Sequence, residues 1–404
     1  MRLCLTCEER FFRTPDGSFW SAGPSSYSFT RRYLGPFEEV RVIARAEDVR
    51  EPRKGWSRAD GEGVKFGPIP YYLGPVQYLK RVRSITKAVR TSLGPRDALV
   101  MRVGSQIASI MTAVLQGGRP YALEVIGDPL NVFARGSTEH PLRPFWRWWF
   151  TRLQRYQCAH ATAVCYVTGD YLQRLYPCSH SAFSTSFLNM ELDASSFIDA
   201  PRRFNNLPKP IRLITIGGLD QPYKGIDLLI RAVRQCVLRG WDLELAIVGG
   251  GRYRAQLEQE ADRAGIARRV LFLGAIGAGP PVREQLDRSQ LFVLFSKTEG
   301  LPRAMIEAMG RGLPCIGSAV GGIPELLAPP YLVPRGDSAA LANKIVALLA
   351  DPSHLNEASA GNLERARQYT DLLLDAKRAE FLDYLRRRTE SWLAQCNLKS
   401  VGRS

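Results

Sequence analysis

Residues 291–308 read LFVLFSKTEGLPRAMIEA. The apolar run 291–295 predicts a buried β-strand, and the spacing of apolar residues after Pro302 predicts a helix. Gly300 and Pro302 between these two segments predict a strand-to-helix turn. The N–H groups that open such a helix face the carboxyl end of a sheet. They form an anion site that suits a diphosphate.

Two carboxylates flank this predicted anion site. Glu299 lies in the loop before the helix. Glu307 lies about two turns inside the helix. Ionised carboxylates accept hydrogen bonds from vicinal hydroxyl groups, so the pair can bind hydroxyls on both sides of a diphosphate. The alternative is a solvated helix that carries two surface glutamates.

Strands alternate with helices on both sides of this segment, which predicts parallel sheets with right-handed crossovers. In the second half of the chain we expect strands at 211–216, 243–248, 270–273 and 314–318, and helices at 226–239, 253–264 and 304–310. In the first half we expect strands at 3–6, 40–44, 99–103, 121–125 and 163–167, and helices at 76–91, 105–115 and 144–158.

Two glycine-rich loops follow strands of the second half. Gly217 and Gly218 open a loop that contains Lys224, a point charge suited to phosphate oxygens. The spacing is not that of a P-loop. A run of three glycines, 249–251, follows the next strand, and Arg254 stands where a dinucleotide fingerprint would need glycine.

In combination these segments resemble the nucleotide-sugar half of family 4 glycosyltransferases, often called group 1. The resemblance is strong over residues 211–330. The ordered motifs that carry it are Ile216-Gly217…Lys224-Gly225, Ile247-Val-Gly-Gly-Gly251, Val270-Leu-Phe-Leu-Gly274, Glu299-Gly-Leu-Pro…Glu307-Ala and Gly321-Gly-Ile-Pro-Glu325. Segments 123–129 and 166–177 are more loosely similar to group 1 enzymes of bacterial surface-polysaccharide pathways.

The resemblance implies the GT-B fold, an α/β class in which two Rossmann-like domains with parallel sheets face each other across a crevice. It implies an acceptor-binding domain over 1–200 and a donor-binding domain over 201–370. A C-terminal helix over 371–404 is expected to pack back on the first domain. Residues 196–209 are polar and broken by proline, and we expect them to be the linker.

The resemblance also implies a retaining hexosyltransferase that needs no metal and no cofactor. Glu299 would bind hydroxyls of the donor sugar, Lys224 its diphosphate and Glu307 the ribose. The backbone at Gly300 and Leu301 would lie near the sugar and the diphosphate. The expected donor site also includes four glycines: Gly217, Gly218, Gly249 and Gly250.

The chain departs from the family pattern at three places. Gly218 stands where many relatives have a diphosphate-binding arginine, and Arg252 or Arg303 are candidate substitutes. The usual histidine after strand 121–125 is absent, and His140 is a candidate catalytic replacement. The usual glycine loop of the first domain is replaced by residues 16–23. We expect four residues on the acceptor side: Gly17, Gly23, Glu124 and Asp128.

Charge and aromatic residues suggest a membrane partner. The 404 residues carry a net charge of +16, spread over both halves of the chain. A diffuse positive field suits phosphorylated ligands or an anionic membrane better than nucleic acid, whose readers usually carry a basic stripe. Phe145-Trp-Arg-Trp-Trp-Phe150 suits a membrane interface, or else a helix whose tryptophans pack inside.

Composition limits the remaining possibilities. No run of about 20 apolar residues predicts a membrane-spanning helix. The first ten residues lack the apolar core of a signal peptide. Cys4 and Cys7 have the spacing of half a zinc or redox site, but no second pair follows, so buried free thiols are expected in a reducing, cytoplasmic compartment.

The leading hypothesis is a glycosyltransferase that moves a sugar from a nucleotide-diphosphate donor to a growing, lipid-linked glycan for a cell-surface polysaccharide. We expect it in the cytoplasm, with peripheral contact at the inner face of the plasma membrane and no nucleic-acid partner. Two alternatives remain at this point: a GT-B sugar-nucleotide epimerase, and an inactive GT-B protein that binds a partner or glycan.

Overall fold

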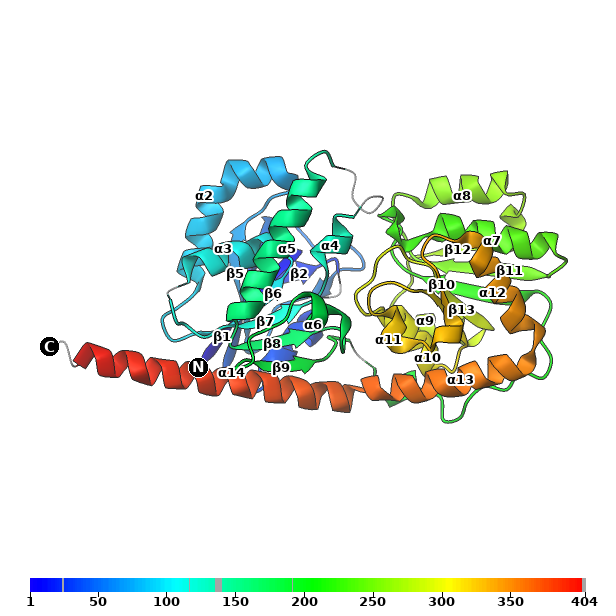
Figure 1. Ribbon diagram of the computed structural model, residues 1–404. Coiled ribbons are helices and arrows are strands. Elements are labelled where there is room, and N and C mark those ends of the chain that lie inside the picture. The colour runs from blue at the N-terminus through cyan, green and yellow to red at the C-terminus, as the bar shows by residue number, and fades with distance from the viewer. Residues whose placement is uncertain (24, 116, 135–139, 191, 402–404) are drawn as a thin grey trace.

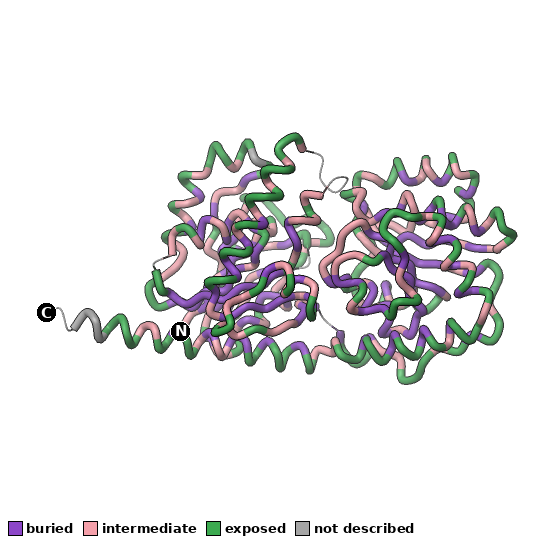
Figure 2. Tube along the Cα trace, viewed as in Figure 1, coloured by how far each residue is buried: buried purple, intermediate pink, exposed green. Residues whose placement is uncertain are grey.

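The computed structural model describes residues 1–23, 25–115, 117–134, 140–190 and 192–401. Two α/β units lie next to each other, each built around one sheet, and a long helix runs along the first unit (Figure 1). Buried residues concentrate in the strands and on the inner sides of the helices (Figure 2). The predicted α/β class with two parallel sheets is confirmed.

The N-terminal sheet has a parallel centre and an antiparallel extension. The parallel strands, in spatial order, are β5 (Val64–Pro70), β3 (Glu39–Asp48), β1 (Arg2–Arg13), β6 (Ala98–Val103), β7 (Ala122–Val125), β8 (Ala163–Tyr166) and β9 (Phe183–Ser186). The end of β1 turns back into β2 (Phe19–Ser21), which pairs with β4 (Ser57–Arg58). β1 is therefore longer than the strand predicted at 3–6.

Helices cover both faces of this sheet. On one face, Val89, Met111 and Cys158 share a buried cluster with strand residues. On the other face, Phe29 is buried in a different cluster. The helices of this unit are α1 (Tyr27–Thr30), α2 (Gly74–Ser92), α3 (Gln106–Val114), α4 (Pro129–Val132), α5 (Arg143–His160) and α6 (Tyr171–Leu175).

The C-terminal sheet is parallel throughout, with the strand order of a doubly wound Rossmann sheet. Its strands, in spatial order, are β12 (Val270–Gly274), β11 (Leu243–Val248), β10 (Ile211–Ile216), β13 (Leu291–Leu294), β14 (Cys315–Ser318) and β15 (Leu332–Val333). Apolar, β-branched strands buried on both faces explain this arrangement. The bounds of β10 and β11 are those predicted.

Helices also cover both faces of the C-terminal sheet. They are α7 (Ile226–Leu238), α8 (Arg254–Arg263), α9 (Pro280–Asp287), α10 (Arg303–Gly310), α11 (Ile323–Leu326), α12 (Ser338–Ala350) and α13 (Pro352–Ala366). The carboxyl ends of the strands open towards the first unit, so the loops that follow β10, β11 and β13 line one edge (Figure 1). That edge is the expected ligand position in open α/β sheets.

The chain returns to the N-terminal unit through α14 (Asp371–Val401). Asp371 Oδ1 accepts a hydrogen bond from the N–H of Leu192 at 2.8 Å. Phe381 and Leu385 are buried, and Phe381 meets Phe187 with 5.7 Å between ring centroids. Residues 402–404, the end of the predicted helix, lie outside the described residues. Of the described helices, none is long and apolar enough to cross a membrane.

Candidate active site

The loop between β13 and α10 holds Glu299 at the carboxyl edge of the C-terminal sheet. The Glu299 side chain is 9% exposed. Its Oε1 accepts hydrogen bonds from Lys224 Nζ and Ser296 Oγ, each at 2.6 Å. Among the described residues, Oε2 of Glu299 has no hydrogen-bond partner. One oxygen is therefore held by the protein, and the other is left for a ligand hydroxyl.

Lys224 comes from the loop between β10 and α7. The next residue, Gly225, has a φ of 64°, and a Cβ there would lie 2.1 Å from the carbonyl oxygen of Phe295. Only glycine permits this close approach of the two loops, which brings Lys224 to Glu299. A lysine ammonium has three donors, so the bond to Glu299 leaves two for phosphate oxygens.

The Gly321-Gly322 segment supports the Glu299 loop from another side. Gly321 has a φ of 56°, and a Cβ there would lie 1.9 Å from the carbonyl oxygen of Glu299. The N–H of Gly322 donates to the carbonyl of Gly300 at 2.8 Å. The backbone around Glu299 is thus fixed by a second loop, which keeps the carboxylate in place before a ligand arrives.

Glu307 lies on α10, partly buried, and its carboxylate has no hydrogen-bond or ion-pair partner within the described part of the chain. Burial raises the pKa of the Glu307 carboxyl, and the charges of Arg303 and Arg283 lower it in part. A half-buried carboxylate without a partner is costly to the fold alone. It is well suited to accept two hydroxyl hydrogen bonds from a ligand.

The two units meet beside this loop. The carboxylate of Glu325 accepts hydrogen bonds from the N–H groups of Gly169 at 2.5 Å, Asp170 at 3.2 Å and Tyr171 at 2.7 Å. These N–H groups open α6 of the N-terminal unit, where a negative charge is favourable. We refer to this contact as the Glu325 clasp. A Cβ on Gly300 would lie 3.3 Å from the carbonyl oxygen of Ile126, so the loop between β13 and α10 also lies against the residue that follows β7.

The position of Gly218 leaves room for a larger side chain. A Cβ there would have nothing within 4 Å. Of the two candidate substitutes, Arg252 is occupied, because its Nε donates to the carbonyl of Asp220 at 2.9 Å. Arg303 is exposed at the start of α10 and acts on Glu307 by its charge. Replacement of the diphosphate-binding arginine by Arg252 or Arg303 stays a prediction.

Known proteins share this architecture and these motifs. The family described as "Glycosyl transferases group 1" matches residues 210–351. Protein CapJ of Staphylococcus aureus is 26% identical over 333 residues, which is 81% of each chain. The amylovoran biosynthesis glycosyltransferase AmsK of Erwinia amylovora is 33% identical over 156 residues, 35% of this chain and 38% of AmsK. Residues 210–351 therefore match the group 1 glycosyltransferases, and the chain is similar to proteins of that family.

Solved structures show that the chain has the GT-B fold. Sucrose-phosphate synthase from Thermosynechococcus elongatus superposes with a TM-score of 0.67 at 17% identity, covering 99% of this chain and 100% of that one. Anabaena HepE, solved in complex with UDP-glucose, superposes with a TM-score of 0.64 at 17% identity, covering 95% and 99%. The chain is also similar to proteins of Vi polysaccharide biosynthesis in Salmonella typhi and colanic acid biosynthesis in Escherichia coli.

The structure gives Glu124 a place inside the N-terminal unit. Its side chain is 2% exposed on β7. It accepts hydrogen bonds from Tyr33 Oη at 2.7 Å and Asn189 Nδ2 at 3.1 Å, and Arg102 Nε lies 3.2 Å away. Both oxygens are engaged, so the predicted acceptor residue holds the core of this unit together instead of presenting a free carboxylate.

Asp128 is also engaged by protein groups. It caps α4 by accepting from the N–H of Leu130 at 2.9 Å, and it accepts from Asn131 Nδ2 and Tyr171 Oη, each at 2.8 Å. Tyr176 Oη also donates to Asp128, at Oδ1. The helix cap explains an aspartate at this position. Contact of Glu124 or Asp128 with an acceptor stays a prediction.

His140 lies just before α5, and its Nδ1 accepts a hydrogen bond from the N–H of Leu142 at 3.1 Å. Among the described residues, no hydrogen bond joins His140 to Lys224 or Glu299. The catalytic role of His140 stays a prediction.

The predicted acceptor loop 16–23 forms a hairpin on the end of β1. Gly17 turns it with a φ of 84°, and hydrogen bonds from Thr14 and Ser18 lower the pKa of Asp16 to about 2. A Cβ on Gly23 would lie 3.6 Å from Glu9 Oε2. That oxygen is buried without a partner in the described structure. The sequence analysis missed Glu9, because nothing in its neighbourhood marks it.

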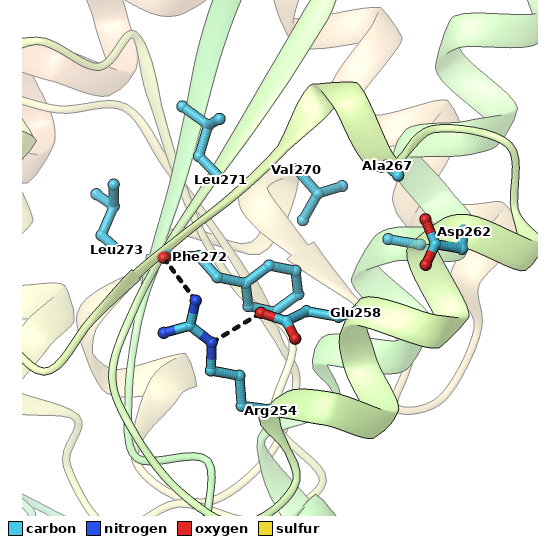
Figure 3. A pocket seen from close by; sticks show the side chains of 9 residues that line it. Arg254, Glu258, Asp262, Ala267, Val270, Leu271, Phe272 and Leu273 are labelled. Carbon is cyan, nitrogen blue, oxygen red and sulfur yellow. Dashed lines mark hydrogen bonds and ion pairs between the residues drawn. The ribbon is translucent and has the colours of Figure 1, made fainter.

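A hollow on the C-terminal unit lies away from this site. It is bounded by α8 and the edge strand β12 (Figure 3). Arg254 Nε donates to Glu258 Oε1 at 2.8 Å on the same helix, and the guanidinium also donates to the carbonyl of Phe272 on β12 at 3.4 Å. These groups satisfy one another, so the hollow is a surface feature of the sheet edge.

Proposed function

We propose that this chain transfers a sugar from a nucleoside-diphosphate sugar to a growing, lipid-linked glycan, with retention of anomeric configuration. The observation that carries the proposal is the donor-side arrangement. Lys224 and Glu299 are paired at 2.6 Å, and Glu307 lies nearby on α10 without a partner. Each has donor or acceptor capacity left for a ligand at the carboxyl edge of the sheet.

The reaction places each of these groups at a different part of the donor. Glu307 holds the ribose hydroxyls, and Glu299 Oε2 accepts from a sugar hydroxyl. The free N–H groups of Lys224 face the diphosphate. The acceptor oxygen bonds to the anomeric carbon while the bond from that carbon to the phosphate oxygen breaks. The electron pair leaves with the diphosphate, which takes the acceptor's proton. Lys224 stabilises the charge that develops there.

We further propose that the transfer needs no metal ion. Lys224 supplies positive charge at the diphosphate, and Arg303 at the start of α10 adds to it. The helix that opens at Pro302 contributes the partial positive charge of its N-terminus. Together these groups take the place that a divalent cation has in metal-dependent transferases.

Similarity to a glycosyltransferase of amylovoran biosynthesis and to proteins of Vi polysaccharide and colanic acid biosynthesis supports a polysaccharide as the product. We propose that a membrane-bound lipid anchors the acceptor. We propose that the enzyme works in the cytoplasm, at the inner face of the plasma membrane. The net charge of +16 supports contact with anionic lipid.

The first experiment is a thermal-shift series with UDP, GDP, dTDP and ADP, each with and without EDTA. A ligand at 100 times its Kd adds about 2.7 kcal/mol to the unfolding free energy, which the assay resolves. Stabilisation by one diphosphate in the presence of EDTA supports the proposal. No shift with any of the four would favour a binding protein that has lost its donor site. Retention is then tested by determining the anomeric configuration of the product by NMR.

A further inference from the structure

Two helices of the N-terminal unit have a one-sided charge. α2 and α5 together carry nine lysines and arginines and no aspartate or glutamate. The basic residues are Lys80, Arg81, Arg83, Lys87, Arg90, Arg143, Arg147, Arg152 and Arg155. Within the described residues, none of them forms an ion pair. A large part of the net charge of +16 is therefore uncompensated on these two helices.

Large apolar side chains are exposed on the same helices and beside them. Trp148 is 56% exposed and Trp149 is 45% exposed. The others on α2 and α5 or directly before them are Leu73, Val76, Leu79, Leu142, Phe145 and Tyr156. The rings of Phe145 and Trp149 contact each other, with 6.3 Å between centroids. Apolar side chains gathered in this way usually mark an interaction surface.

Both helices belong to one layer on one face of the N-terminal sheet. α3 lies between them, because it packs against α2 and because Gln157 Nε2 of α5 donates to Thr112 Oγ1 of α3 at 2.8 Å. Their outer sides are largely exposed (Figure 2). We call the outer side of these helices the α2/α5 face.

A groove of about 730 Å³ runs along α5 on this face. Arginines and aromatic rings line it together, among them Arg147, Arg152, Trp148 and Phe133. The arginine guanidinium forms bidentate hydrogen bonds with phosphate oxygens, and tryptophan side chains are enriched at the membrane–water interface. The lining thus offers both kinds of contact that a phospholipid surface needs.

We propose that the α2/α5 face docks on an anionic phospholipid bilayer. The charge complementarity is the decisive argument. A second copy of this chain would bring two sets of uncompensated positive charge together, whereas an anionic leaflet neutralises them. Tryptophan and phenylalanine beside the arginines fit an interfacial contact.

The α2/α5 face lies on the side of the N-terminal unit that leads to the proposed donor site. Leu130 of α4 lines the groove, and α4 begins just after the end of β7. Ile126, the residue that follows β7, lies against Gly300. A short stretch of chain therefore joins the groove to the loop between β13 and α10, and the docked bilayer would hold a lipid-linked acceptor on that side of the protein. This use of the face rests on the proposed function, while the docking itself does not.

The test is co-sedimentation of the full chain with vesicles of phosphatidylcholine, alone or mixed with phosphatidylglycerol. Each basic residue near an anionic surface contributes about 1 kcal/mol, so Arg147→Gln with Arg152→Gln should weaken binding roughly 30-fold. Trp148→Ser with Trp149→Ser should also weaken it. The matched controls are exposed residues of the C-terminal unit, Arg263→Gln with Arg268→Gln and Leu238→Ser.

The proposal predicts that the wild-type chain binds vesicles that contain phosphatidylglycerol and does not bind vesicles of phosphatidylcholine. The α5 variants should lose this binding, the control variants should keep it, and added salt should weaken it. It is overturned if the wild-type chain stays in solution with anionic vesicles, or if the α5 variants bind like the wild type. Self-association abolished by the tryptophan changes, without vesicle binding, would overturn it in favour of a second copy. Unfolding midpoints verify that each variant folds. The nucleotide thermal shift is independent of vesicles, so failure of docking is distinguishable from failure of the donor site.

Discussion

Replacing Glu307 by glutamine should stabilise the free enzyme and weaken its nucleotide binding. Both effects come from one feature, a half-buried carboxylate without a protein partner. The fold partly removes this carboxylate from water without a compensating hydrogen bond, which only a bound ligand supplies. Glutamine has the same shape, so the substitution removes the charge without opening a cavity.

The loss in affinity follows from hydrogen bonds to the ribose. A hydrogen bond to a charged group contributes about 1.5–3 kcal/mol. The neutral amide keeps one weaker acceptor, and loss of one such bond raises the Kd of the nucleoside diphosphate roughly 10- to 150-fold. The Kd is measured by isothermal titration calorimetry with the diphosphate that gives the largest thermal shift.

The gain in stability has a defined dependence on pH. Burial raises the pKa of the Glu307 carboxyl above its ordinary value of 4.5. A carboxyl whose pKa is raised in the folded state destabilises that state at higher pH, and this cost is relieved as pH falls through the folded pKa. Glu307→Gln should therefore unfold at a higher temperature than the wild type at neutral pH. The difference should shrink as the pH approaches 4.5.

The control is Glu364→Gln, an exposed glutamate on α13, which should change neither property. The reasoning is refuted if Glu307→Gln binds the nucleotide with unchanged Kd. It is equally refuted if the variant is less stable than the wild type at neutral pH, since the carboxylate would then have a protein partner.

Three other variants test the remaining contacts. Glu299→Gln should abolish turnover while changing the nucleotide Kd by less than about tenfold, and should lower the unfolding free energy by about 1–3 kcal/mol because Lys224 loses its charged partner. Adding Lys224→Met should recover part of that stability in a double-mutant cycle; full additivity would contradict the pairing. Position 218 has open space for a larger side chain. Gly218→Arg should therefore lower the Kd of the nucleoside diphosphate about tenfold relative to that of the monophosphate, whereas Gly218→Ala should leave this ratio unchanged. Glu325→Gln should lower the unfolding free energy by about 1 kcal/mol and increase the radius of gyration in X-ray scattering; an unchanged radius would argue against the clasp.

The C-terminal sheet could be predicted closely because its strands are continuous apolar runs that end in glycine. β10 and β11 have the predicted bounds, and β13 is one residue shorter. β5 was missed because its sequence contains Gly67, Pro68 and Pro70, which argue against a strand. It lies at the edge of the N-terminal sheet, where proline is tolerated.

The proximity of Lys224 and Glu299 could be predicted because both follow strands of one parallel sheet, whose carboxyl ends share an edge. Their partners could not. Ser296 lies in segment 291–308, but its sequence position alone does not predict that its hydroxyl donates to Glu299. Glu325 closes a motif, yet the N–H groups that it accepts from lie 154 or more residues earlier in the chain. Contacts of this range depend on how the two units meet, which no local pattern encodes.

The two units differ in how many hydrogen-bond partners their carboxylates have within the protein. On the donor side, Glu307 and one oxygen of Glu299 have no partner among the described residues. On the other side, Glu124 and Asp128 are held by protein groups, and Glu9 keeps a buried oxygen unpaired. Under the proposed function, charged groups fixed on the C-terminal sheet bind the nucleotide sugar. The hairpin around Glu9, with its unpaired oxygen, is then a candidate for binding the acceptor. Loops vary more readily than a sheet edge, so one donor scaffold can serve many acceptors.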